Sequence, residues 1–531
     1  MDVLNLLMRV LRAKASAAHT RLCGVRRSQR SQGRQPPASQ ARDWLSRDRG
    51  VLAGAAKPPL VEDLGFPQLE VVRDSERMRK VFQKHLRPLN GKTYQIRECL
   101  VSRVFHRKAT RCVVLYTLHL EDPDTGQEWS QWVSGVMQAG SKPRRTWKKL
   151  RRSSSGSEVP GVSPVFEPFS YLSNLKMLVQ VFPYDHQLPA LSLLMAGPPP
   201  ELEPLLLARF GPGDWRAEAW DVETVRYRAS SRCTLRLTVQ AQDATTGRAE
   251  ERCFYAKVYG NEERGEQTYQ VLQALWNRGN AGGVSFTVGR PIAYLSDLRT
   301  LVQEEAPGTS LKDKLLREEN VVPAVQKVAR ALAALHLDHV PVPRQRRLWE
   351  EVRHLEKIGK LLQQACPYLE PEVKEIVGTV VAGLVELPLA PTHRDFHPDN
   401  ILIDGDRLSL IDLDVFSEAD PLLDVARLLV GLAFMPLDYS LTHERAQIAA
   451  QAFAEEYFVY VPEAWRTSLP LHLAAAFLKS AAGLLRSQPG RRPDMVEAII
   501  KESKDSLEGR GWWQRSLENG TEGYLFSSFS S

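Results

Sequence analysis

The sequence lacks the cysteine patterns of metal-binding and disulfide-stapled proteins. Only six of its 531 residues are cysteine, no two form a C-x-x-C pair, and their spacing matches no zinc site. Scattered single cysteines are typical of a reducing compartment, so we expect a cytoplasmic protein. No apolar run reaches the roughly 18 residues needed to cross a bilayer, and the sequence therefore predicts no membrane span.

Two widespread motifs are also missing. The chain contains neither G-x-S-x-G nor G-x-x-x-x-G-K-[ST]. These absences exclude the nucleophile elbow of α/β-hydrolases and the phosphate loop of Walker-type NTPases. Apolar residues make up 43% and charged residues 25% of the chain, which is an ordinary globular balance for a protein of two to four domains.

Net positive charge is confined to two segments. The chain carries a net +7, but residues 1–60 alone contribute +9 and the run 142–152 contributes +7. The remaining body is at −9, so bulk charge does not indicate a nucleic-acid partner. We expect the run 142–152 to be a solvated loop.

The basic segment 1–60 is expected to be a disordered leader. Residues 1–42 hold eight Arg, one Lys and a single acid, Asp2. In a eukaryote this composition would resemble a transit peptide, which would direct the protein to an organelle. There are two alternatives to a transit peptide: the segment is a disordered basic arm, or the start codon is assigned too far upstream.

An internal repeat organises the first half of the chain. Residues 171–180 recur as 294–303, with seven of ten positions identical at an offset of 123. Upstream, six further matches share an offset of 121, which favours a duplicated module. In the second copy, residues 233–240 and 252–259 alternate apolar and polar side chains and predict strands, followed by a helix over 262–276 and a strand over 300–303.

The second half changes to helical periodicity. Long amphipathic helices are predicted over 325–337, 350–364 and 372–386, and the chain after residue 420 is mainly helical. A β-rich part followed by a helix-rich part predicts an α+β protein with two lobes.

The most specific segment is 391–414, with the sequence PTHRDFHPDNILIDGDRLSLIDLD. Its residues 401–403 and 408–411 are short apolar strands around a tight turn, and we expect a hairpin. Such a hairpin would bring Asp395, Asn400 and Asp412 to one end. Two carboxylates and an amide oxygen form a hard-oxygen set that suits Mg²⁺ and phosphates.

This segment resembles the catalytic loop and metal strand of the aminoglycoside phosphotransferase/choline kinase-like family, whose fold is similar to that of protein kinases. The family pattern H-x-D-x-x-x-x-N followed by I-D is filled by His393, Asp395, Asn400 and the pair 411–412. The resemblance covers about residues 215–500. It implies an ATP- (or GTP-) and Mg²⁺-dependent kinase of a small hydroxyl compound, such as an aminoglycoside, sugar or amino alcohol.

The resemblance also implies roles for single residues. Asp395 would accept the proton of the acceptor hydroxyl or orient that hydroxyl, and Asn400 and Asp412 would hold Mg²⁺. Lys257 would pair with the α- and β-phosphates, supported by Glu266 or Glu263. The carbonyl of Glu304 and the amide of Ala306 would meet the adenine edge.

One departure from the family concerns the turn that covers the phosphates, residues 228–232. This turn has no glycine, and Ser230 and Ser231 would have to meet the phosphates. The alternative function is therefore a nucleotide-binding pseudokinase that acts as a sensor or scaffold.

The first copy lacks the catalytic machinery. Val136 stands where Lys257 stands in the second copy, and we expect the basic run to replace the helix. The resulting domains are the leader 1–60, a degenerate small-lobe module 61–197 through which a protein partner could bind, an N-lobe 215–306, a helical C-lobe 307–515 and a flexible tail 516–531.

Overall fold

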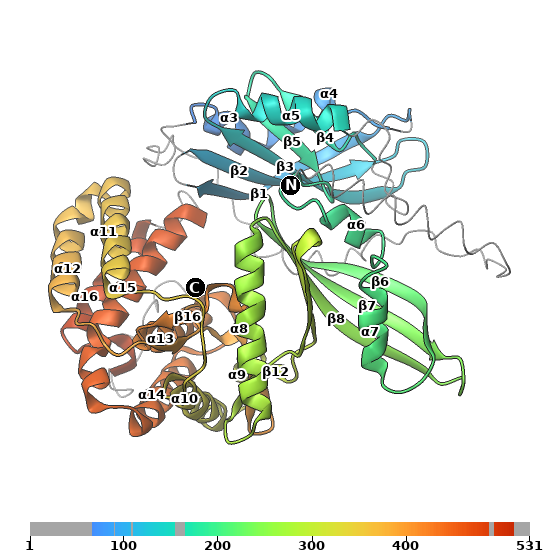
Figure 1. Cartoon of the computed structure of the whole chain (residues 1–531). Coiled ribbons are helices and arrows are strands. Elements are labelled where there is room, and N and C mark those ends of the chain that lie inside the picture. Colours follow the sequence, from blue (N-terminus) through green and yellow to red (C-terminus); the bar gives the residue numbers. More distant parts are fainter. Residues whose placement is uncertain (1–65, 90, 108–109, 154–164, 488–492, 515–531) are drawn as a thin grey trace. The chain divides into compact units, whose positions relative to one another are not determined.

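The computed structural model describes residues 66–89, 91–107, 110–153, 165–487 and 493–514 (Figure 1). The predicted leader 1–60 and tail 516–531 lie outside the described residues. The chain divides into two compact units. The first unit runs to Glu262 and includes Ile292–Val302, and the second comprises Glu263–Pro291 and the chain from Gln303 onward.

The first unit contains two five-stranded sheets. The first sheet has the strand order β1-β2-β3-β5-β4, and the second has β6-β7-β8-β11-β10, which is the same order along the chain. The strands of the first sheet are β1 (Gln95–Arg107), β2 (Arg111–Glu121), β3 (Glu128–Gln138), β4 (Phe169–Leu172) and β5 (Met177–Val181). Those of the second are β6 (Trp215–Arg228), β7 (Arg232–Asp243), β8 (Ala249–Tyr259), β10 (Pro291–Leu295) and β11 (Thr300–Glu304).

The two sheets also share their pairing register. Val113 pairs with Val136 in the first sheet, and Thr234 pairs with Lys257 at the positions 121 residues later. Lys176 and Arg299, which are 123 residues apart, both adopt left-handed backbone angles, with φ of 48° and 47°. Duplication of one module is the interpretation that we favour for these shared features.

The sheets stack through an apolar core. From the second sheet, Leu235 and Ala256 face this core, and from the first sheet Val113 and Val136 do. Because strand residues alternate between faces, Lys257 lies on the opposite face of the second sheet. In the first sheet, Val136 stands at the position that corresponds to Lys257. The face that carries Val136 is packed against the second sheet, whereas the face that carries Lys257 is not part of this core.

The basic run is a helix, and the predicted loop is wrong. Helix α5 spans Lys142–Ser153 and follows β3, as helix α8 (Glu262–Asn280) follows β8. Trp147 and Leu150 are three residues apart, so they share one helix face, and both pack against the core between the sheets. Trp147 also stacks on Tyr171 with ring centroids 5.9 Å apart. These apolar contacts hold the helix, and its basic side chains remain on the outside.

The remaining helices of the first unit are short or N-terminal. They are α3 (Leu69–Arg73), α4 (Ser75–His85), α6 (Leu191–Met195) and α7 (Glu203–Leu207). Helix α4 begins at the N-cap Asp74, whose side chain accepts from the Arg77 N–H, and it buries Met78 and Phe82 in the core of the first sheet.

The second unit is mainly helical. The predicted helices are present as α10 (Val322–His336), α11 (Leu348–Ala365) and α12 (Glu370–Gly383). The other long helices are α13 (Leu422–Asp438), α14 (His443–Tyr460), α15 (Glu463–Ser487) and α16 (Pro493–Leu507), and α9 (Leu311–Arg317) is short. The predicted hairpin is formed by β14 (Ile401–Asp404) and β15 (Arg407–Leu410). It pairs with β9 (Phe286–Val288) and β12 (Thr309–Ser310), while β13 (Ala390–Thr392) pairs with β16 (Ser417–Ala419).

Within the described residues, one helical stretch, Glu463–Arg486 of α15, is long and apolar enough to cross a bilayer by length and composition alone. Half of its apolar window is buried inside the protein. Helices α13 and α16 pack against α15, which is the environment of a core helix.

The stacking of the sheets predicts that Val136→Lys destabilises the protein. Val136 is 2% exposed, so a lysine there would place an unpaired charge in the core and cost about 3 kcal/mol or more. Urea unfolding should show this loss, whereas Val225→Lys at an exposed site on β6 should change little. Equal stability of the two variants would contradict the packing described.

Candidate active site

The loop between β13 and β14 is braced by a buried histidine. His393 is fully buried, and its Nε2 lies 2.9 Å from the carbonyl oxygen of Ile411. Because a carbonyl can only accept, Nε2 carries the proton, and Nδ1 accepts from the Asp395 N–H at 3.3 Å. The imidazole thus links the loop between β13 and β14 to the segment after β15, and both ring nitrogens are occupied.

Asp424, in the first turn of α13, holds the same loop by two hydrogen bonds. Its buried carboxylate accepts from the N–H groups of His393 at 2.7 Å and Arg394 at 2.6 Å. Arg394 has a φ of 64°, a left-handed angle that costs a non-glycine residue about 1–2 kcal/mol. The two charge-assisted hydrogen bonds offset this cost and fix the direction in which the chain enters Asp395.

The carboxylate of Asp395 is partly exposed and has two basic neighbours. Arg427 lies 3.4 Å away and the Nε2 of His397 lies 3.8 Å away. Arg427 was not among the residues predicted from the sequence. The sequence did contain a signal for Arg427. This residue follows Asp424 by three positions, so both lie on the same face of the predicted helix.

Asn400 and Asp412 flank the open end of the hairpin, with Asn400 directly before β14 and Asp412 two residues after the end of β15. The Asn400 side-chain N–H donates to the carbonyl of Asp395 at 3.0 Å, and the Asn400 carbonyl accepts from the Ile411 N–H at 3.1 Å. The first bond assigns the amide oxygen as the remaining acceptor of the side chain. Asp412 follows directly, with a left-handed φ of 57°.

The donor set suits a magnesium ion bound together with a nucleotide. In the described part of the chain, no group of three or more His, Cys, Asp or Glu residues could hold a metal ion by itself. Mg²⁺ typically takes one or two protein oxygens and completes its shell with phosphates and water. The amide of Asn400 and the carboxylate of Asp412 fit that requirement.

Arg344 connects the segment that follows Asp412 to helix α8 within the second unit. Its guanidinium donates to the backbone carbonyl of Asp414 at 2.6 Å, to the side chain of Gln267 at 2.5 Å and to the Arg264 carbonyl at 3.0 Å. The helix that carries Glu263 and Glu266 is thereby joined to the segment that follows Asp412. Sequence patterns gave no indication of this role for Arg344.

The predicted adenine-binding backbone lies beside Gly289. A Cβ atom at this position would lie 2.6 Å from the Glu304 carbonyl oxygen and 3.3 Å from the Ala306 nitrogen. The Glu304 N–H itself donates to the Arg290 carbonyl at 2.9 Å. Glycine at 289 therefore permits the close approach of this segment to the two atoms expected to meet a base.

The predicted phosphate contacts belong to the first unit. Lys257 is half-buried, and its ammonium lies 5.8 Å from the centroid of the Tyr259 ring. Ser231 is exposed at the tip of the turn between β6 and β7, whereas Ser230 is buried. Glu266 and Glu263 are exposed residues of α8, and the pairing of either with Lys257 stays a prediction.

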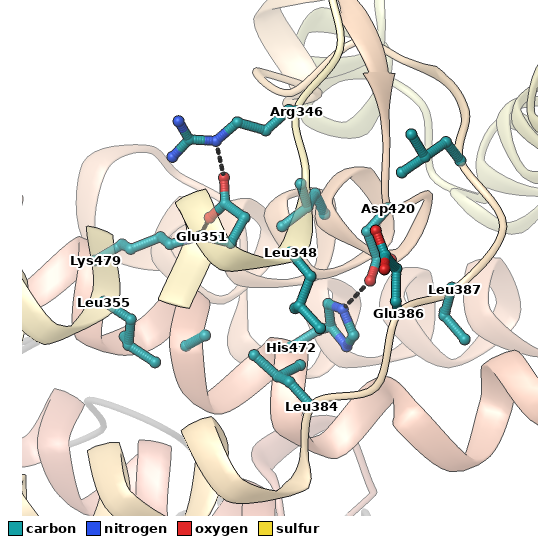
Figure 2. Close-up of a pocket in the computed structure, with 13 residues that line it drawn as sticks. Arg346, Leu348, Glu351, Leu355, Leu384, Glu386, Leu387, Asp420, His472 and Lys479 are labelled. Atoms are coloured by element: carbon teal, nitrogen blue, oxygen red, sulfur yellow. Dashed lines mark hydrogen bonds and ion pairs between the residues drawn. The ribbon is translucent and has the colours of Figure 1, made fainter. Parts of the chain in front are cut away.

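A small cavity lies within the helical unit (Figure 2). Its wall combines leucine side chains with two polar clusters: Glu351 with Arg346 and Lys479, and Asp420 with His472. The residues that line it do not include Asp395, Asn400 or Asp412. We therefore assign this cavity to the packing of the helical unit, and not to the site that holds Asp395, Asn400 and Asp412.

Comparison with known proteins agrees with this site. Residues 212–469 match the model of the phosphotransferase enzyme family, APH. This part of the chain, which holds Asp395, Asn400 and Asp412, is similar to the members of that family. No protein with a curated description matches the sequence.

Solved structures of low sequence identity are similar over part of the chain. A choline/ethanolamine kinase family protein from Mesorhizobium loti is 15% identical, with a TM-score of 0.36, and the match covers 58% of this chain and 92% of that one. A Plasmodium vivax ethanolamine kinase is 14% identical, with a TM-score of 0.36 and coverages of 55% and 84%. The ADP-bound aminoglycoside phosphotransferase APH(2'')-Ib is 13% identical, with a TM-score of 0.36 and coverages of 58% and 99%.

The paired charges of the cavity predict a pH-dependent contribution to stability. Burial alone would raise the pKa of Glu351, but Lys479 and Arg346 lower it from 4.5 to about 2. A lowered carboxyl pKa stabilises the fold above pH 4.5, and this contribution is lost as the pH falls toward 2. Glu351→Gln should therefore cost about 3 kcal/mol at pH 7 and progressively less below pH 4.5.

Urea unfolding at pH 7 and at pH 3 measures this difference. Glu356→Gln on the same helix is the control, since Glu356 is exposed. A gap between Glu351→Gln and the wild type that stays constant over this range would refute the assigned ion pairs.

Proposed function

We propose that the protein is an ATP- and Mg²⁺-dependent phosphotransferase that moves the γ-phosphate of a nucleotide, ATP or GTP, to a hydroxyl of a small polar molecule. The observation that carries the proposal is the juxtaposition of Asp395, Asn400 and Asp412 at one end of the β14–β15 hairpin. The family match over residues 212–469 supports phosphotransfer as the reaction class. The acceptor type, an aminoglycoside, sugar or amino alcohol, rests on the family resemblance.

Asp395 supplies the carboxylate that would bind the hydroxyl group of the acceptor. Its carboxylate would accept a hydrogen bond from the acceptor hydroxyl, direct that oxygen at the γ-phosphorus and take its proton. The new O–P bond would form as the bond between the γ-phosphorus and the β,γ-bridging oxygen breaks, and the nucleoside diphosphate would leave. Arg427 at 3.4 Å orients the carboxylate. Because the loop is fixed by His393 and Asp424, Asp395 needs little reorganisation before reaction.

Asn400 and Asp412 supply the ligands for the metal, which neutralises phosphate charge when it is bound. Lys257 adds a positive charge for the α- and β-phosphates. The backbone of Glu304 and Ala306 would fix the base by one acceptor and one donor. In this proposal the protein contributes positioning and charge, and no covalent intermediate on the enzyme is required.

Replacement of Asp395 tests the reaction. Purified protein is first screened with MgATP and a panel of hydroxyl-bearing metabolites, and ADP release is measured. Asp395→Ala should lower kcat with the responding acceptor at least about 10³-fold, with an unchanged melting temperature because this carboxylate lies at the surface of the loop. Asp406→Ala, at the exposed hairpin tip, should remain active. Turnover by Asp395→Ala at the wild-type rate would disprove the assigned mechanism.

Replacement of Asp412 tests the metal site separately. Asp412→Asn removes one anionic ligand, so the Mg²⁺ concentration at half-maximal activity should rise about tenfold or more. Asp404→Asn, at the exposed far end of the same hairpin, is the matched control. The assignment fails if both variants keep the wild-type Mg²⁺ dependence.

A further inference from the structure

A buried carboxylate from the first sheet's module contacts the turn expected to cover the nucleotide phosphates. Asp185 follows β5 and is 3% exposed. It accepts from the backbone N–H of Ser230 at 2.5 Å and from the hydroxyl of Tyr227 at 2.9 Å. Both donors belong to the β6–β7 hairpin of the second sheet, so this is a contact between the two modules inside the first unit.

Further contacts hold the same hairpin. The side-chain N–H of Gln180 donates to the Ser134 hydroxyl at 3.0 Å and lies 3.5 Å from the Ser230 hydroxyl. The Tyr227 ring packs against two aromatic rings of the first module, those of Trp132 at 6.2 Å and Phe182 at 5.1 Å. Tyr227 and Ser230 are thus enclosed by polar and aromatic groups of the first module, which are far away in the sequence.

These contacts explain how a turn without glycine keeps its shape. Ser230 has a φ of 60°, in the left-handed region that glycine adopts freely and other residues adopt at a cost. Its N–H donates to a buried carboxylate, which makes a strong hydrogen bond. Asp185 therefore stabilises the conformation that a glycine would otherwise supply.

The contacts also determine which groups of the turn are left for a ligand. The Ser230 N–H is used by Asp185, and the Ser231 N–H donates to the Arg228 carbonyl at 2.9 Å. The Ser231 side chain is exposed. The first module packs against the face of the second sheet opposite Lys257, so it supports the turn from the side away from Lys257.

We propose that Asp185 is a positioning residue for nucleotide binding, which holds the turn 228–232 so that Ser231 and Lys257 can meet the phosphates. The first module is then a structural part of the nucleotide site rather than a separate docking domain. This inference rests on the proposed function, because it requires that the site binds a nucleotide.

Calorimetric titration of the full chain with MgATP tests the inference without a known acceptor. Asp185→Asn keeps the size of the side chain but removes the charge that accepts from Ser230, and the Kd for MgATP should rise about tenfold. Tyr227→Phe removes only one donor to the carboxylate and should raise the Kd about threefold. Tyr227→Phe preserves the packing of the ring, so it still tests the inference if Asp185→Asn does not fold.

Asp122→Asn is the matched control. Asp122 is also a buried aspartate of the first module, and it holds the turn between β2 and β3 by accepting from the Asp124 N–H at 3.0 Å. Its replacement should lower the melting temperature without changing the Kd for MgATP. A loss of general stability is thereby separated from a loss of turn geometry.

A double variant tests the assigned cause. Adding Ser230→Gly to Asp185→Asn should recover most of the lost affinity, because glycine adopts the left-handed angle without the carboxylate. Absence of MgATP binding by the wild type would overturn the proposed function and this inference together. If the wild type binds and both Asp185→Asn and Tyr227→Phe match it, or if glycine restores nothing, the inference alone is overturned.

Discussion

Two backbone N–H groups of the catalytic loop, those of His393 and Arg394, donate to the buried carboxylate of Asp424. The geometry of the site depends on this interaction, because it holds Arg394 at a left-handed angle and so sets the position of Asp395. From Asp395 the chain continues to Asn400, whose side chain bonds back to the Asp395 carbonyl. One buried carboxylate thus fixes the loop that carries Asp395 and Asn400, the residues proposed to bind the acceptor and the metal.

The same physical device occurs in the first unit. At the β6–β7 turn, Ser230 also has a positive φ without being glycine, and its N–H donates to the buried carboxylate of Asp185. In both places a strained backbone is stabilised by a charged acceptor from another segment of the chain. The two loops that would meet the phosphates and the acceptor are therefore held by the surrounding fold, rather than by their own local propensity.

The sequence predicted the elements with strong local signals and missed those that depend on tertiary contacts. Alternation and helical periodicity placed β7, β8 and α10 to within a few residues, and the tight turn at 404–406 correctly predicted the β14–β15 hairpin. Helix α5 was missed because its charged composition outweighs two apolar residues that become informative only when the sheet beneath Trp147 is known. Asp185 and Arg344 could not be found from sequence, since the partners described for them lie at least 42 and at least 70 residues away. The pairing of Glu266 or Glu263 with Lys257 stays a prediction.

The central claim is that this site binds a nucleotide through a magnesium ion held by Asn400 and Asp412. Calorimetric titration of the wild-type protein with ATP, in the presence and absence of Mg²⁺, tests it most directly. The account predicts saturable binding that is at least about tenfold tighter with Mg²⁺ than without it. Failure to bind ATP under either condition, or an affinity that is the same with and without the metal, would contradict it.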